Sequence, residues 1–151
     1  MKHKGLWALL LGSAVAMGIG SAAMAGTNPI EAREACMKAN AGMMKVMVPV
    51  LKGQAAYDKG AIDAAIAKAE AACSGWADWW GEDTKPGGAV KTEAKLEIWT
   101  DPAGFEAAGG AYVKAMETMK ASTDEASFKA AFPALGKSCQ GCHEKYRQAD
   151  D

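Results

Sequence analysis

Apolar side chains recur at helical spacing soon after residue 26. Between Asn28 and Gly53 they return every seven residues, as on one face of a helix packed in a bundle. Asn28 is a good cap residue, and Pro29 suits the first position of a helix. We expect Pro49 to bend the last turn and Gly53 to end the helix. The predicted buried seam consists of Ile30, Met37, Ala41, Met44, Val48 and Leu51.

Three further helices are predicted downstream. The second covers about 58–79, and its apolar face carries Ile62, Ile66, Ala69 and Cys73. The third covers 101–121 and repeats the pattern of a cap residue before a proline. The fourth begins at Ser122 or Thr123 and ends near Gln148, with a perturbation at Pro133.

The connection between the second and third helices is irregular over 81–92, and a short helix is predicted over 93–99. No stretch alternates apolar and polar residues as a half-buried strand does. The other links are short, which makes the helices that they join antiparallel neighbours. We therefore expect an all-α fold, an antiparallel up-down four-helix bundle that forms one domain over 26–151.

The first 25 residues have the pattern of a cleaved secretory signal peptide. Lys2 and Lys4 precede an apolar stretch, and small residues end in Ala23-Met24-Ala25. A retained membrane anchor is the alternative, but the apolar stretch is short for a span of about 20 residues. We expect export to the periplasm, with cleavage after residue 25.

Charge gives little information about partners. Cleavage removes two of 17 basic residues and none of 18 acidic residues, so the formal charge moves from −1 to 15 − 18 = −3. This mildly acidic balance predicts neither a nucleic acid nor an anionic membrane as a partner.

A Cys-x-x-Cys-His motif near the C-terminus carries the clearest chemistry. Two cysteines three apart on a helix share a face, so both can form thioethers to haem vinyl groups, and the next residue can reach the iron. A redox dithiol normally lies in a βαβ setting, which this sequence does not predict. A zinc site needs four ligands, but the only other histidine in the sequence, His3, is removed with the predicted signal peptide. The motif predicts one covalent haem c, bound through Cys139 and Cys142 with His143 as the proximal iron ligand.

The position of the motif in the last helix resembles class II cytochromes c, that is, cytochrome c prime and its low-spin relatives. The resemblance covers the whole mature chain. Residues 136–147 look like the haem-helix signature of the family, and 32–38 are similar to its first-helix pattern. Class I cytochromes c have the reverse order, with the motif near the N-terminus and a methionine ligand late in the chain.

The resemblance implies that the residue opposite His143 decides the function. Met37 occupies the distal position, and as an iron ligand it would make the protein a one-electron carrier between redox partner proteins. The alternative is a five-coordinate, high-spin cytochrome c prime that binds nitric oxide or carbon monoxide, with Met37 packed over the iron without a bond. Met44 is a second candidate ligand, although methionine at helical spacing is usually core filler. No distal acid–base group is evident, so we do not expect an enzyme.

The resemblance also implies roles for two arginines. Arg33 matches a residue that contacts a haem propionate, and Arg147 matches a basic residue close to the proximal imidazole. The alternative for Arg33 is a solvated surface cation. Many relatives form homodimers, but the sequence does not decide the oligomeric state.

Two cysteines lie outside the motif. Cys36 and Cys73 are each about fifteen residues from the turn that joins the first two helices, so they fall at similar heights. A disulfide fits this placement and an oxidising compartment, and two buried thiols are the alternative. Four tryptophans near the irregular connection predict an apolar plug at one end of the bundle, or a docking patch for a redox partner: Trp76, Trp79, Trp80 and Trp99.

Overall fold

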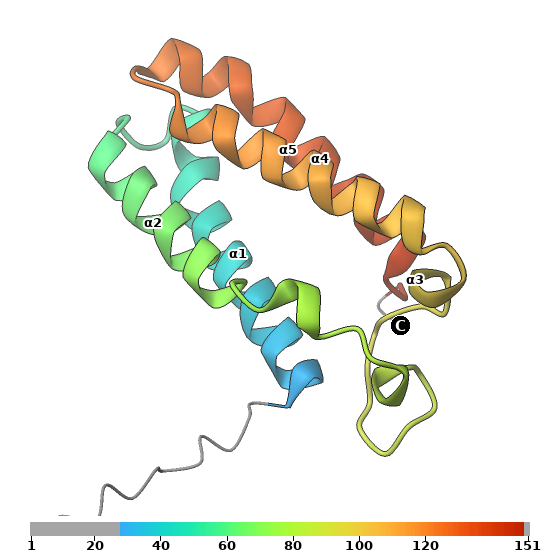
Figure 1. Cartoon of the computed structure of the whole chain (residues 1–151). Helices are drawn as coiled ribbons and strands as arrows, with labels where there is room; N and C mark the ends of the chain where they lie inside the picture. Colours follow the sequence, from blue (N-terminus) through green and yellow to red (C-terminus); the bar gives the residue numbers. More distant parts are fainter. Residues whose placement is uncertain (1–27, 150–151) are drawn as a thin grey trace, which may run out of the picture.

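The computed structural model describes residues 28–149, and this part of the chain is helical (Figure 1). Four long helices form the bundle: α1 (Pro29–Leu51), α2 (Lys59–Ala72), α4 (Pro102–Lys120) and α5 (Glu125–Tyr146). The connection between α2 and α4 holds the short helix α3 (Glu97–Thr100) and two 3-10 turns, Trp76–Asp78 and Glu82–Thr84. The expected all-α four-helix bundle is confirmed. The predicted signal peptide lies outside the described residues.

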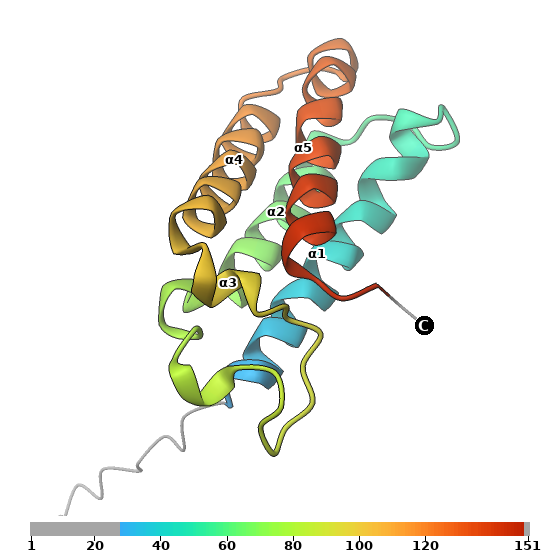
Figure 2. The same ribbon diagram turned by 90° about the vertical axis from the view of Figure 1, so that its right-hand side faces the viewer.

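The bundle consists of two hairpins, α1 with α2 and α4 with α5. In the view of Figure 2, α5 lies in front, with α4 on one side and α1 on the other. The irregular connection lies at the end of the bundle opposite the two short loops (Figure 1). Within 28–149 no helix is long and apolar enough to span a bilayer.

Local cap chemistry fixes where three of the long helices begin. The Asn28 side chain accepts from the amide of Ile30, and the Asp101 side chain accepts from the amide of Gly104. Asp124 and Ser127 form a reciprocal capping box at the start of α5. The predicted starts of α1 and α4 are confirmed, and α5 begins two to three residues later than predicted.

The prediction for the second helix was wrong in its extent. The sequence pattern continues to residue 79, whereas α2 ends at Ala72 and Cys73 is its C-cap. A Cβ at Gly75 would lie 2.8 Å from Nε1 of Trp79, so the chain packs tightly where it leaves the helix. The short helix predicted over 93–99 is likewise reduced to α3, because residues 93–95 lie along the C-terminal end of α5: the Lys95 amide donates to the carbonyl of Tyr146.

The predicted seam of α1 was wrong in its register. Met43 and Met47 are fully buried, whereas Met37 is 37% exposed. Met44, Val48 and Leu51 pack only at the edge of the core. The buried face of α1 instead follows the neighbouring repeat of Cys36, Met43 and Val50, one residue earlier, and of the predicted seam only Ile30 is buried. The core itself centres on Met43, Met47, Ile66, Met119, Phe128 and Leu135.

Asp101 ties the start of α4 to the end of α5. One carboxylate oxygen accepts from the Gly104 amide at 3.1 Å, and the other accepts from the Tyr146 hydroxyl at 2.9 Å and from the Lys145 ammonium. A Cβ at Gly104 would collide with the Asp101 carboxylate and lie 2.5 Å from the Tyr146 hydroxyl. Glycine at this position therefore lets the two helix ends meet.

Asp101→Asn is expected to change how stability depends on pH. Hydrogen bonds from Lys145, Tyr146 and the Gly104 amide hold the pKa of the Asp101 carboxyl below its usual range. A carboxyl with a lowered folded-state pKa stabilises the fold above its unfolded pKa of about 4, and this contribution disappears as the pH falls through the folded value. Asp101→Asn should therefore lower the urea midpoint at pH 7 and converge with the parent protein as the pH falls through the folded-state pKa.

Asp63→Asn is the matched control, because it removes only an exposed ion pair with Lys59. Its urea midpoint should stay close to that of the parent protein at pH 7. If the stability difference between Asp101→Asn and the parent protein did not shrink as the pH falls below about 4, the proposed contribution of this carboxylate would be wrong.

Candidate cofactor site

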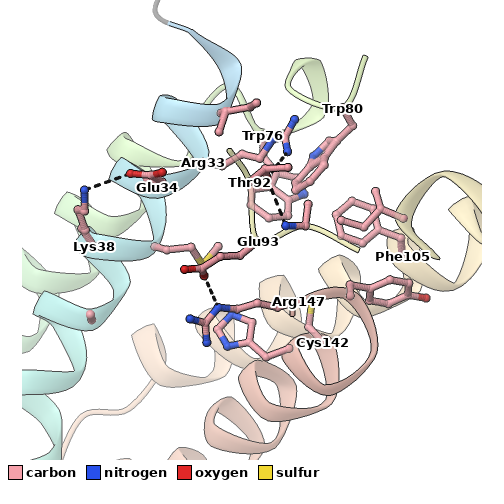
Figure 3. A pocket seen from close by; sticks show the side chains of 17 residues that line it. Arg33, Glu34, Lys38, Trp76, Trp80, Thr92, Glu93, Phe105, Cys142 and Arg147 are labelled. Carbon is pink, nitrogen blue, oxygen red and sulfur yellow. Dashed lines mark hydrogen bonds and ion pairs between the residues drawn. The ribbon is translucent and has the colours of Figure 1, made fainter. Parts of the chain in front are cut away.

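A cavity of about 470 Å³ opens between α1, the C-terminal part of α5 and the irregular connection (Figure 3). This volume is within the range of cofactor sites, about 300–1,000 Å³. Its lining is mostly apolar, and the aromatic part comes from Trp76, Trp80, Phe105 and Tyr146. The cavity brings together residues from the two ends of the sequence.

The α5 side of the cavity carries the Cys-x-x-Cys-His motif. Cys142 and His143 line the cavity, and Cys139 lies one turn earlier, half-buried against the apolar core. The two cysteines are not joined to each other or to another cysteine. Burial raises the pKa of both thiols. A reactive redox dithiol has a lowered pKa at a helix start, so this environment does not support that alternative.

The α1 side of the cavity carries Met37. This side chain lines the same cavity as His143, and its 37% exposure shows that the core does not hold it. Met44, two turns further along the helix, packs against the core and is not part of the cavity lining. The structure therefore brings Met37, and not Met44, to the side opposite the motif.

Arg33 is buried, with only 6% of its surface exposed, so the alternative of a solvated cation was wrong. Its guanidinium donates two hydrogen bonds to the Trp79 carbonyl, at 3.1 Å from Nε and 2.6 Å from Nη2. It also lies 4.2 Å from the centre of the Trp80 ring. Burial lowers the pKa of Arg33, and Asp83 opposes this shift. Arg33 thus fastens the irregular connection to α1 (Figure 3).

Arg147 is four residues beyond His143 and also lines the cavity. Its Nε donates to the Glu93 carboxylate at 2.7 Å, as Figure 3 shows. The backbone beside this ion pair is also held, because the Gln148 amide donates to the Glu93 carbonyl at 2.7 Å. The irregular connection therefore restrains both arginines.

The four tryptophans form part of a larger aromatic cluster. Trp80 lies edge-on to Phe105, with ring centres 4.6 Å apart, and Phe105 contacts Tyr146 at 5.2 Å. The sequence did not identify Phe105, Tyr146, Thr92 or Glu93 as site residues. Phe105 follows the helical period of α4, and no local pattern marks Thr92 and Glu93, so only the tertiary fold reveals them.

Cys36 and Cys73 form a disulfide between α1 and the end of α2, with their Cα atoms 4.8 Å apart. Cys36 directly precedes Met37 in the chain, and its side chain is buried. The disulfide therefore joins the first hairpin at the height of the cavity.

The cavity residues fit a haem c. Two unpaired thiols and an imidazole lie together beside an apolar space, which is the donor set for covalent haem attachment. Trp80 Nε1 is buried and has no hydrogen-bond partner among residues 28–149, so an acceptor on a bound group would satisfy it.

Comparisons with known proteins agree with this geometry. The family model for cytochrome c′ matches residues 28–147. Cytochrome c′ from Rubrivivax gelatinosus is 28% identical over 80% of this chain and 94% of its own, with a TM-score of 0.70. A nitric oxide complex of a cytochrome c prime variant from Alcaligenes xylosoxidans is 29% identical over 82% and 98%, with a TM-score of 0.66.

A structure of oxidized cytochrome c556 from R. palustris is 26% identical over 82% of this chain and 98% of its own, with a TM-score of 0.71. A search of curated proteins gives no match. The expected resemblance to class II cytochromes c is confirmed: the chain belongs to the cytochrome c′ family, whose proteins carry one covalently bound haem c.

Proposed function

We propose that this chain is an exported monohaem cytochrome that binds nitric oxide or carbon monoxide on the α1 side of its cofactor. The observation that carries the proposal is the shared cavity, in which His143 lines one side and Met37 lines the other. The likeness to a nitric oxide complex from Alcaligenes xylosoxidans supports it. A haem attached here supplies an iron whose sixth position can take a diatomic ligand.

The α5 residues are proposed to hold the cofactor. Cys139 and Cys142 provide the two thioether sulfurs, and His143 provides the proximal nitrogen. The other face of this helix packs in the core through Phe128 and Leu135, both fully buried. A rigid helix gives these three side chains a fixed geometry, which a preorganised site requires.

Two donors on the other side of the cavity are proposed to hold the propionates. Arg33 lines the cavity, and its weakest hydrogen bond, from Nη1 to Thr92 Oγ1 at 3.5 Å, is the one most easily redirected. The unpaired N–H of Trp80 is the second donor. Arg147, held by Glu93, is proposed to lie beside the imidazole, where its charge tunes the iron.

Met37 is proposed to cover the distal face without bonding to the iron. A thioether carries no proton and is a weak hydrogen-bond acceptor, so it favours an apolar gas over water.

The second candidate function is the one-electron carrier with Met37 as the sixth ligand. It is favoured by the presence of Met37 in the same cavity as His143, and by the likeness to cytochrome c556 from R. palustris. The comparisons support the gas-binding alternative more strongly, because cytochrome c′ proteins make up most of the similar structures.

Location and partners are also proposals. Residues 1–25 support export to the periplasm followed by cleavage. Redox partner proteins would supply or accept the electron that sets the oxidation state, and a homodimer is proposed from the family resemblance. No catalytic step forms part of this function.

The spin state and carbon monoxide uptake of the purified haem protein test the proposal. We expect a high-spin ferric absorption spectrum and carbon monoxide binding after reduction. Met37→Ala should keep the spin state and raise the carbon monoxide association rate by about tenfold, which corresponds to about 1.4 kcal/mol. Met44→Ala, which changes a residue outside the cavity, is the control and should leave the rate unchanged.

The contrary outcome is equally specific. A sulfur-to-iron charge-transfer band in the ferric protein, lost in Met37→Ala and retained in Met44→Ala, would establish the methionine ligand. The chain would then be the electron carrier.

Arg33→Gln tests the propionate contact. Removing a positive charge close to the haem favours the ferric state, so the reduction potential should fall by roughly 30 mV. Lys129→Gln is the control, because Lys129 is exposed, paired with Glu125 and outside the cavity lining. Spectroelectrochemical titration measures both variants, and equal shifts would show that Arg33 has no special contact with the cofactor.

A further inference from the structure

The cavity lies between the two hairpins, so its width depends on what joins them. Met37 belongs to the first hairpin and His143 to the second. Packing within each hairpin is close, whereas fewer contacts cross between the hairpins. A bond between α1 and α4 or α5 at the height of the cavity would therefore control the distance between the distal and proximal residues.

Asn40 and Tyr112 form such a bond. The Tyr112 hydroxyl, on α4, donates to Oδ1 of Asn40, on α1, at 2.6 Å. Asn40 is three residues beyond Met37, and side chains at this spacing lie on neighbouring parts of a helix surface. The bond therefore acts close to the residue that covers the distal face.

The amide group of Asn40 is held on its other side as well. Its Nδ2 donates to the Cys36 carbonyl at 3.0 Å and lies 3.3 Å from the Cys73 sulfur. Asn40 thus contacts both ends of the disulfide that joins α1 to α2. The chain of contacts runs from α2 through the disulfide and Asn40 to Tyr112 on the second hairpin.

Tyr112 connects this series of contacts to α5, the helix that carries the haem motif. Its ring and Cys139 both pack against the same apolar core. Burial raises the pKa of Tyr112 to about 12, and the hydrogen bond with Asn40 opposes this shift. The hydroxyl therefore stays protonated and remains a donor at physiological pH.

We propose that Asn40 and Tyr112 are positioning residues, whose hydrogen bond sets the separation between Met37 and the haem helix and so determines whether the methionine leaves the sixth position open. Neither residue touches the cavity. The inference rests on the proposed function, because it concerns access to the same iron. It assigns a role to Asn40, Tyr112 and the Cys36–Cys73 disulfide, none of which is required for haem attachment.

The experiment compares Tyr112→Phe with Tyr57→Phe in the full haem-loaded protein. Tyr57 also donates one hydroxyl hydrogen bond between the hairpins, to the Ser122 carbonyl at 3.3 Å, but it does so at the loop end of the bundle. Each variant therefore loses one tyrosine hydroxyl that donates a hydrogen bond between the hairpins. Thermal melts check that both are folded.

We expect Tyr112→Phe to change the carbon monoxide affinity of the reduced protein by about fivefold. The ferric spin-state spectrum should change with it, and amide hydrogens around residues 37–41 should exchange faster. Tyr57→Phe should change none of these three measurements. Asn40→Ala should reproduce the effects of Tyr112→Phe, and the double variant should add little, because both changes break one bond.

The inference is wrong if Tyr112→Phe and Tyr57→Phe behave alike, or if the Asn40 and Tyr112 effects are additive. Failure of the proposed function has a different signature, because the parent protein itself would then be low-spin with Met37 bound. In that case the positioning role still requires Tyr112→Phe, and not Tyr57→Phe, to weaken the sulfur-to-iron charge-transfer band. An unchanged band would overturn it.

Discussion

The separation between two helical hairpins is the constraint on which the rest of this structure depends. A cavity of about 470 Å³ lies between α1 and α5, and apolar walls tend to collapse unless other contacts hold them apart. The bundle core, centred on Phe128 and Leu135, fills the remainder of the interhelical space. The irregular connection closes the open end, fastened to α1 by Arg33 and to α5 by Glu93 and Asp101.

Polar groups do much of this positioning. Arg33 is buried with its charge, yet two hydrogen bonds to one carbonyl and the face of Trp80 compensate for the lost hydration. Asn40 links the disulfide of the first hairpin to Tyr112 of the second. Because such groups are costly to bury unpaired, each holds its partners in one geometry. The same geometry places Met37 and His143 in the lining of one cavity.

Sequence reasoning predicted the parts of this protein that depend on local chemistry. The caps at Asn28 and Asp101 and the all-α bundle were correct, because short-range patterns specify them. The end of α2 and the register of the α1 seam were wrong. Apolar spacing alone does not distinguish a helix face that packs in the core from one that lines a cavity: the predicted repeat contains Met37, which lines the cavity, whereas the buried repeat contains Met43. Thr92 and Glu93 entered the site only through tertiary contacts. The iron-ligand roles of His143 and Met37 remain predictions.

The central claim is that the cavity holds a haem whose distal position is open although a methionine lies beside it. Iron K-edge X-ray absorption on the ferric protein tests this claim most directly, because it reports the atoms bound to the metal. The account predicts nitrogen neighbours from the porphyrin and one imidazole, without a sulfur shell. A resolved iron–sulfur shell that disappears in Met37→Ala would contradict it.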